Sequence, residues 1–476
     1  MQNKEKILIL LLPLAIVTLL FLNLFSIEKA IFAVMLVLLL ASFVFRPELG
    51  VYGMIFSLPF TFISFKLPFQ VIGEGVLPLP DLISIFAFLG FVLNCLFFHL
   101  FRGAHKKIHW PVFGPFLFFM SAVIISSLFS NEVWKSLWYS LRTIFVIYWF
   151  FIFLPYNVLD NFRKFKKAML SFALSALGLS TLAVYTLSQQ NFAKEFVRFR
   201  MLNEDSQAIV ASFLSRISDK SIIMYPYATE HLLLAEFLLA EFFITLALRN
   251  LYHDRTRRFL NMLLIFVFIV LFGTFSRGIW LCLMVIGLIY GFNFLKRNFR
   301  KYSLLVLLAL MISSPLFYHM YKIQSDYRVG GSSNENRMLS FNVAMNSFVD
   351  RPMLGRGSGE FVRVVARDIR YVSKFGKPPD AFGFWQKITV ENGLIGMVAF
   401  LYFSFYVLRM VWQKMKIEKY KFVLLPISAA ALSVYLFELT NVSYYTGKMW
   451  LPIGLLLAAI NILDKNEKIV KYRESL

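Results

Sequence analysis

Long blocks of apolar residues, separated by short charged segments, dominate the pattern of this chain. Most blocks approach the roughly 20 residues that an α-helix needs to cross a bilayer core of about 30 Å. The pattern predicts membrane-spanning helices near 7–25, 30–45, 50–65, 82–101, 111–129, 141–156, 168–187, 230–248, 259–275, 278–295, 303–319, 392–412, 422–437 and 447–463. The blocks at 30–45 and 50–65 are short, so twelve spans is the alternative to fourteen.

Lysine and arginine are distributed unevenly between these blocks. They gather in every second short loop and in the C-terminal tail, at 102–107, 163–167, 249–258, 296–301, 414–421 and 465–473. The other short loops, around 26–29, 66–81, 130–140 and 438–446, are nearly free of them. Because cytoplasmic loops carry an excess of these residues, we predict that both termini are cytoplasmic. Two long segments, 188–229 and 320–391, then face outward.

Composition agrees with a membrane protein. Of the residues, 59% are hydrophobic and 16% are charged, whereas soluble domains average about 45–50% and about 25%. The basic loops explain most of the net charge of +22 without a nucleic-acid partner. Cys95 and Cys282 lie inside apolar blocks and offer neither a disulfide framework nor metal-ligand spacing. We predict an all-α polytopic membrane protein of about 12–14 transmembrane helices. Residues 1–476 form a single integral membrane domain, and 320–391 is a large outward loop containing amphipathic helices.

An arginine interrupts the longest apolar block. Phe259–Leu295 has 37 residues, too many for one span, so it is expected to turn back between Gly273 and Gly278. By the orientation above, this turn faces outward and places Arg277 at the outer membrane face. The alternatives are a side chain that reaches from a helix end to the interface and a functional intramembrane charge.

Four stretches resemble one family of bacterial membrane enzymes. They are FSRGIWLCL (Phe275–Leu283), ISSLFSNEVWKSLWYSLR (Ile125–Arg142), NRMLSFNVAMNSFVDRPMLGRGSGEF (Asn336–Phe361) and ENGLIGMVAFLYF (Glu391–Phe403). In their order, spacing and outward placement they resemble the O-antigen ligase and O-antigen polymerase superfamily. The resemblance extends from about residue 80 to the end of the chain.

The resemblance implies a glycosyltransferase of the bacterial inner membrane. Such enzymes transfer a glycan from undecaprenyl pyrophosphate to an acceptor hydroxyl at the periplasmic face, so the 320–391 loop is expected to be periplasmic. Ligases use lipid A–core as acceptor, and polymerases use another lipid-linked repeat unit. The implied partners are the lipid-linked oligosaccharide, the acceptor, membrane lipids and a chain-length regulator. No metal or other cofactor is implied.

The expected reaction requires positively charged side chains. Attack at the anomeric carbon expels a pyrophosphate, and preorganised positive charge stabilises the leaving oxygens. Arginine suits this because its planar guanidinium binds phosphate bidentately and stays charged. The functional arginines of the family correspond to Arg277 and Arg337. Arg142, at the end of the second motif, is a further candidate for substrate binding.

Basic residues also follow the third motif. In Gly359–Phe375 the apolar residues Phe361, Val365, Ile369 and Val372 have helical spacing, and Arg363, Arg367, Arg370 and Lys374 line another face. The pattern predicts one amphipathic helix on the membrane with a cationic stripe. This stripe either contacts anionic lipid or guides the pyrophosphate donor.

One position departs from the family. Ligases carry a histidine about nine residues before the glutamate of the last motif, where this chain has Phe382. The difference favours a polymerase over a ligase. A base could instead be Glu391, which otherwise is a charge at a helix N-terminus. Glu230 and His231, at another outward helix start, are candidates for substrate binding or for helix capping.

A transporter or flippase of lipid-linked glycans is the alternative from another class. Transporters often show internal repeats and ionisable residues near the bilayer midplane. In this chain the unusual charges gather at the outward face and in one long loop, which favours an enzyme.

Overall fold

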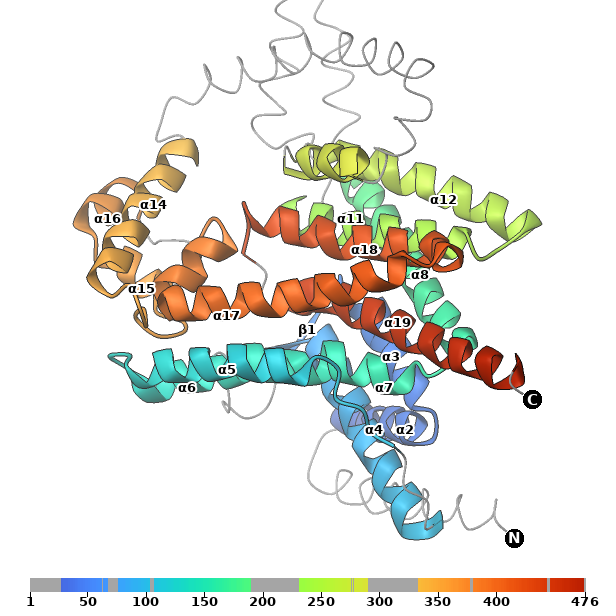
Figure 1. Cartoon of the computed structure of the whole chain (residues 1–476). Coiled ribbons are helices and arrows are strands. Elements are labelled where there is room, and N and C mark those ends of the chain that lie inside the picture. The colour runs from blue at the N-terminus through green and yellow to red at the C-terminus, as the bar shows by residue number, and fades with distance from the viewer. Residues whose placement is uncertain are drawn as a thin grey trace, which may run out of the picture.

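The computed structural model describes residues 27–61, 63–66, 76–102, 107–189, 231–274, 276, 278–289, 333–376, 380–442 and 446–474. In these residues the chain forms a helical bundle with one antiparallel pair of short strands, β1 (Ser64–Lys66) and β2 (Val76–Pro78) (Figure 1). The helices of the first half are α2 (Ile27–Phe45), α3 (Pro47–Ser57), α4 (Leu79–Arg102), α5 (Phe113–Leu128), α6 (Val133–Ser140), α7 (Leu154–Val158) and α8 (Phe162–Gln189). Those of the second half are α11 (His231–Arg249), α12 (Asp254–Gly273), α14 (Ser333–Asp350), α15 (Phe361–Ala366), α16 (Ile369–Phe375), α17 (Phe384–Met415), α18 (Glu418–Glu438) and α19 (Gly447–Glu474).

The predicted fold class is confirmed: this is an all-α polytopic membrane protein. In the described residues, seven helices are long and apolar enough to cross a membrane: Leu79–Phe97, Val133–Val158, Phe162–Tyr185, Asp254–Gly273, Phe384–Met415, Tyr420–Glu438 and Gly447–Lys465. Shorter apolar helices occupy Met35–Phe45, Phe113–Leu128 and Gly278–Ile289. The spans predicted at 7–25 and 303–319 lie outside the described residues, so the total of 12–14 stays a prediction.

Two predicted spans differ from the structure. The block 50–65 is not one helix, because α3 ends at Ser57 and the chain turns into β1. Eleven helical residues extend only about 16 Å at 1.5 Å per residue, about half the thickness of a bilayer core. The span expected at 141–156 begins earlier, at Val133. There α6 continues into α7 through the π-helical segments η1 (Leu141–Phe145) and η2 (Tyr148–Phe153).

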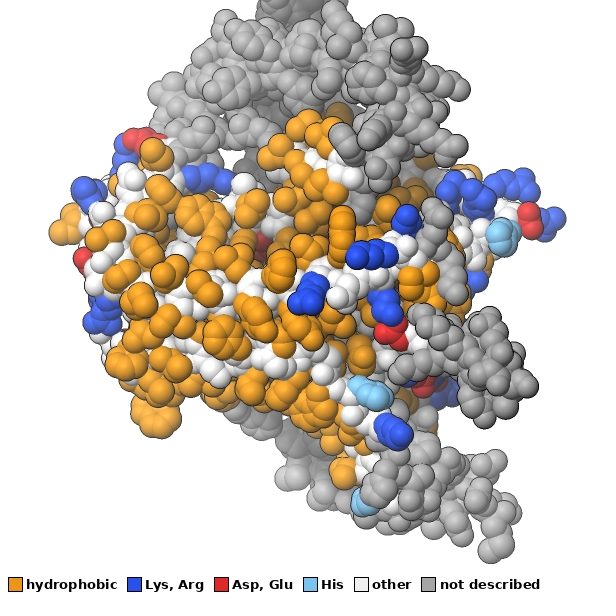
Figure 2. Space-filling view, viewed as in Figure 1, with side chains coloured by type: hydrophobic (Ala, Val, Ile, Leu, Met, Phe, Trp, Pro, Cys, Tyr) orange, Lys and Arg blue, Asp and Glu red, His pale blue; other side chains and the backbone are white. Residues whose placement is uncertain are grey.

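The helices pack around α11 and α19. Helix α11 lies between α8 and α18, α17 lies against α5 and α18, and α19 contacts α18 and η2. Trp450 of α19 is completely buried, and its ring lies 5.5 Å from that of Phe403 of α17. Apolar side chains also cover much of the outer surface (Figure 2), among them Phe268 of α12 and Phe405 of α17. A surface of this kind is stable only where lipid replaces water.

Helices α14, α15 and α16 form a small unit at one end of the bundle, away from the C-terminus (Figure 1). We call this the α14–α16 end. The unit has its own apolar cluster, formed by Val343, Ala344, Phe361, Val365, Tyr371, Ala381 and Val390. Because Val390 belongs to α17, this cluster joins the α14–α16 unit to the bundle.

Candidate functional site

A loop at residues 351–360 lies against a break in α17. The break is at Gly393, whose φ of 64° and ψ of −163° are not helical. Four backbone hydrogen bonds join loop and helix: Leu394 N to Pro352 O (2.8 Å), Ile395 N to Met353 O (3.2 Å), Arg356 N to Val390 O (2.8 Å) and Gly357 N to Glu391 O (2.8 Å). They pair amides and carbonyls that an interrupted helix would otherwise leave without partners.

The glycines of the loop allow this close approach. Gly355 and Gly357 have φ angles of 70° and 100°, values that side-chain-bearing residues rarely adopt. A Cβ on Gly355 would lie 2.6 Å from the carbonyl carbon and oxygen of Glu391, and one on Gly357 would lie 2.4 Å from Cβ of Ser130. Gly355 is therefore required by the contact between this loop and α17, and Gly357 by the contact between the loop and Ser130.

Glu391 is completely buried in this contact. Its Oε1 accepts a hydrogen bond of 3.3 Å from Phe361 N, at the start of α15, and lies 3.8 Å from Lys387 Nζ. Its backbone carbonyl accepts a hydrogen bond of 2.5 Å from Ser126 Oγ of α5. The role of Glu391 as a base stays a prediction, and the hydrogen bond from Phe361 N places its carboxylate at a helix N-terminus. That helix is α15, however, and not α17, which begins seven residues earlier at Phe384.

Several segments converge on the end of α18 at the α14–α16 end. Arg337 Nη1 of α14 donates to Thr440 O at 3.4 Å, and Trp385 Nε1 of α17 donates to Leu439 O at 3.2 Å. A Cβ on Gly278 would lie 3.4 Å from Thr440 Oγ1 and 3.3 Å from the ring of Phe437. The residue that directly follows Arg277 in the chain and the side chain of Arg337 thus both lie against Thr440, which is two residues beyond the end of α18.

Phe382 and Asp380 border this convergence. The Arg337 guanidinium carbon lies 5.1 Å from the centre of the Phe382 ring, within the range of a cation–π contact. Two residues earlier, both carboxylate oxygens of Asp380 accept hydrogen bonds from Lys387 Nζ, Oδ1 at 2.7 Å and Oδ2 at 2.6 Å. The side chain of Lys387 is 2% exposed, and that of Asp380 is 31% exposed. The site is thus a set of one described arginine, one aromatic ring and one partly exposed carboxylate.

The comparison with protein families identifies this region. Residues 262–401 match the Wzy_C family, described as O-antigen ligase. The match confirms the resemblance that the four motifs indicated. It begins in α12, includes Arg277, Arg337 and the glycine loop, and ends inside α17, whereas the end of α18, on which these segments converge, lies outside the matched residues. No curated protein matches the chain.

For three of the site residues predicted from the sequence, the structure describes no side-chain position. Arg277 and Glu230 lie outside the described residues. His231 is the first residue of α11, and its side chain is not among those described. For Arg277 the structure therefore locates only the chain neighbours Ser276 and Gly278. The assignments of these three residues stay predictions.

The single amphipathic helix predicted at 359–375 is wrong. Two short helices, α15 and α16, replace it, and the break falls at Arg367 and Asp368. Asp368 ends the first helical pattern because its carboxylate caps α16 by accepting a hydrogen bond of 3.1 Å from Tyr371 N. Phe361 and Val365 are buried, but Ile369 is 83% exposed. The apolar positions therefore do not form one stripe.

The cations of this segment are mostly paired. Arg363 contacts Glu132 at 2.8 Å and Glu360 at 2.7 Å, Arg370 contacts Asp368 at 2.9 Å, and Lys374 contacts Glu335. The hydrogen bond from Arg370 holds the pKa of the Asp368 carboxyl below its usual range. Arg367 is exposed, and among the described residues no ion pair to it is found. The predicted continuous cationic stripe is thus replaced by separate pairs, and the part of Arg363, Arg367 and Arg370 in substrate binding stays a prediction.

Arg142 lies near residues of α4 and α6. It is an exposed residue of η1, and its charge acts on Tyr139 of α6 and Asp81 of α4. π-helical segments within α-helices are frequent at functional sites. Tyr139 also lies under Lys387, whose Nζ is 5.6 Å from the ring centre. Arg142 is therefore related to Lys387 through Tyr139, and its part in substrate binding stays a prediction.

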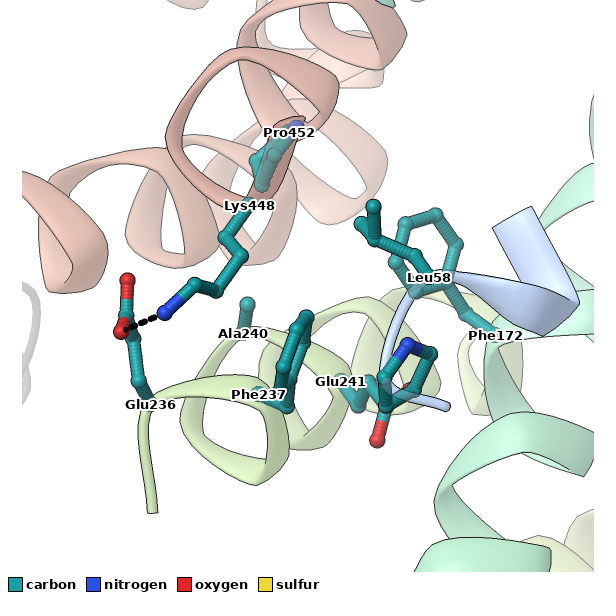
Figure 3. Close-up of a pocket in the computed structure, with 9 residues that line it drawn as sticks. Leu58, Phe172, Glu236, Phe237, Ala240, Glu241, Lys448 and Pro452 are labelled. Carbon is teal, nitrogen blue, oxygen red and sulfur yellow. Dashed lines mark hydrogen bonds and ion pairs between the residues drawn. The ribbon is translucent and has the colours of Figure 1, made fainter. Parts of the chain in front are cut away.

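Buried ionisable residues in the bundle were not found by the sequence analysis. Lys448 of α19 pairs with Glu236 of α11 at 2.6 Å, with 7% and 1% of these side chains exposed. Figure 3 shows the pair beside a small cavity that Glu241 also lines. The signal was available as Glu236 and Glu241 within an apolar block, five residues apart, but nothing in the sequence indicated their partner.

No group that would bind a metal is evident in the described part of the chain: nowhere there do three His, Cys, Asp or Glu side chains come together.

Proposed function

We propose that this protein is a membrane glycosyltransferase of surface polysaccharide assembly. It transfers a glycan from undecaprenyl pyrophosphate to an acceptor hydroxyl, and it acts as an O-antigen polymerase. The observation that carries the proposal is that Arg337 and Gly278, the neighbour of Arg277, both lie against Thr440 beyond the end of α18. Both residues belong to the segment that matches the O-antigen ligase family.

Guanidinium groups suit the departure of a pyrophosphate. As the bond between the anomeric carbon and the pyrophosphate oxygen breaks, negative charge grows on the leaving group. Guanidinium groups held in place by the fold stabilise that charge more in the transition state than in the ground state. Arg337 is held by Thr440 O and by the ring of Phe382, so it does not have to reorganise during the reaction.

The proposal includes a location in the bacterial inner membrane. Both termini are then cytoplasmic, and the α14–α16 end with the active site is periplasmic. The basic loops described above support this orientation. Reporter fusions near residues 105 and 253 should be cytoplasmic, and fusions at residue 350 periplasmic. The opposite labelling would contradict the site as proposed.

Phe382 supports a polymerase over a ligase. A phenyl ring can neither accept nor donate the proton that a histidine could handle at this position. Deletion of the gene should therefore leave single repeat units attached to lipid A–core, since another protein still performs ligation. Loss of all attached glycan, with long chains remaining on undecaprenyl pyrophosphate, would assign the protein as a ligase. Both outcomes are resolved by gel analysis of extracted lipopolysaccharide.

One observation favours a flippase as the second candidate. The Glu236–Lys448 pair is buried between helices of the bundle, and ionisable groups in such places are typical of transport pathways. Purified protein in liposomes with a lipid-linked oligosaccharide separates the two functions, because only a transferase releases undecaprenyl pyrophosphate.

The two arginines provide the direct test. Arg277→Ala and Arg337→Ala should each lower the transfer rate roughly 100-fold or more, which corresponds to about 2.7 kcal/mol of transition-state stabilisation. Arg337→Lys should also be impaired, because a point charge does not reproduce a bidentate contact. Arg409→Ala, at an exposed position of α17, is the matched control and should retain the wild-type rate. Folded, membrane-inserted Arg337→Ala with a normal rate would refute a role at the leaving group.

A further inference from the structure

The acceptor hydroxyl loses a proton in the proposed reaction. Among the described residues of the site, one partly exposed carboxylate, that of Asp380, lies near Phe382 in the chain. Glu391 is completely buried and bound to the start of α15. Asp380 differs in that 31% of its side chain is exposed, and it lies two residues before Phe382, whose ring contacts Arg337. Nothing in the sequence pattern had singled out Asp380.

Lys387 determines how the Asp380 carboxylate is oriented. Its Nζ donates to both oxygens, and Ala381 N donates a further hydrogen bond of 2.9 Å to Oδ1. A carboxylate has about four lone-pair positions. The described contacts occupy both positions on Oδ1 and one on Oδ2. Oδ2 is therefore the atom with an acceptor position left among these contacts.

The lysine is itself strongly constrained. It is 2% exposed, and a cation in such a place is stable only when it is paired. Glu391 Oε1 lies 3.8 Å from its Nζ, and the ring centre of Tyr139 lies 5.6 Å away. Because Glu391 also holds the glycine loop and α15, Lys387 links Asp380 rigidly to the parts of the structure that position α14 and Arg337.

We propose that Asp380 is the general base for the acceptor hydroxyl, and that Lys387 is the residue that positions it. This inference rests on the proposed glycosyl transfer. The acceptor oxygen donates a lone pair to the anomeric carbon, and the bond from that carbon to the pyrophosphate oxygen breaks with its electron pair on the leaving group. The hydroxyl proton passes to Asp380 Oδ2 and from there to water. No further reactant is required.

A carboxylate paired with an ammonium group is a weak base, and the reaction tolerates this. Glycosyl transfer passes through a transition state with oxocarbenium-ion character. The attacking hydroxyl becomes acidic only as its bond to the anomeric carbon forms, so a weak base accepts the proton late. The orientation of Oδ2, set by Lys387, then matters more than its basicity.

The test compares Asp380→Asn with wild type in liposomes, using purified lipid-linked donor and acceptor. The turnover number should fall roughly 100-fold or more, within the range of general-base contributions, while KM for the donor changes less than threefold. The decline of the rate toward low pH should disappear in the variant. The charged groups that face Asp380 are Lys387 and Glu391 of α17, with the Tyr139 hydroxyl of α6, and all of them remain in the variant. Glu335→Gln, which removes a more exposed carboxylate paired with Lys374, is the matched control and should keep the wild-type profile.

Two additional measurements separate chemistry from structure. Formate should restore part of the turnover of Asp380→Ala, because a small carboxylate can enter the vacated space and accept the proton; a residue that only supports the fold would show no such rescue. If the neutral variants are not recovered from the membrane, Asp380→Glu gives the decision. A turnover at least tenfold lower with unchanged KM supports the inference, and a wild-type turnover overturns it. An unchanged rate or pH profile in Asp380→Asn overturns this inference but leaves the proposed function in place. Wild-type protein that releases no undecaprenyl pyrophosphate refutes the proposed function itself.

Discussion

Substitution of Gly355 by alanine tests the contact between the glycine loop and α17. The new Cβ would lie 2.6 Å from the carbonyl carbon and oxygen of Glu391 and 2.7 Å from Gly393 N. All three are backbone atoms, so no flexible side chain can move aside. A non-glycine residue at a φ of 70° adds about 1–2 kcal/mol, and overpacking adds about 1–3 kcal/mol. The docked loop should be destabilised by roughly 2–5 kcal/mol, or about 30- to 5,000-fold in its docking equilibrium.

Hydrogen–deuterium exchange of residues 351–360 measures this effect, together with the rate of glycan transfer by the same preparation. Gly376→Ala is the matched control, because Gly376 has a similar φ of 73° but no atom within 4 Å of the added Cβ. The Gly376→Ala variant has a backbone strain similar to that of Gly355→Ala, but its added Cβ collides with no other atom. Gly355→Ala should show much faster exchange in the loop and a large loss of activity, and Gly376→Ala should show neither. Equal behaviour of the two variants would mean that the contact with Glu391 and Gly393 does not organise the site.

Two other substitutions test separate contacts. Phe382→His should not increase transfer, and should lower it about two- to fivefold, because the contact with the Arg337 guanidinium is worth about 0.5–1 kcal/mol at an exposed site; a gain in activity would show that this position takes part in proton transfer. Lys448→Met should destabilise the bundle by roughly 3–5 kcal/mol, since it leaves the buried carboxylate of Glu236 without its cation. Thermal unfolding in detergent should show this loss and a substantial recovery in the double variant Glu236→Gln/Lys448→Met. A single variant as stable as wild type would show that the pair is not a stabilising element.

The sequence by itself determined the class of the protein and the places where its chemistry is expected. Apolar block length is a local property, and the bilayer thickness converts it directly into a helix count within narrow limits. Arginine inside such a block is costly, which is why Arg277 could be selected without coordinates, whereas Arg337 was selected through the resemblance to the family.

The tertiary structure decided which of these residues meet. Apolar spacing in 359–375 predicted one helix, but the capping of α16 by Asp368 and the burial of Phe361 and Val365 in a separate cluster divided it into two. The spacing of apolar residues shows which face of a helix is apolar, but it does not show which part of the structure packs against that face. The contact of Arg337 with Phe382, and the docking of Gly355 against the backbone of Glu391, join residues that are 36 to 45 positions apart.

The buried ion pairs show most clearly what the sequence determined and what the tertiary structure decided. In the sequence, Lys387 and Asp380 resemble two ordinary solvent-exposed charges. Lys387 is excluded from water only because α17 packs against α6 and the glycine loop. Glu236 and Lys448 are 212 positions apart, and their partnership depends on the packing of α11 beside α19. A buried charge is tolerated only where the fold supplies an opposite one. The sequence therefore showed that charged residues lie within apolar segments. The packing of the helices determined which opposite charge stabilises each of them.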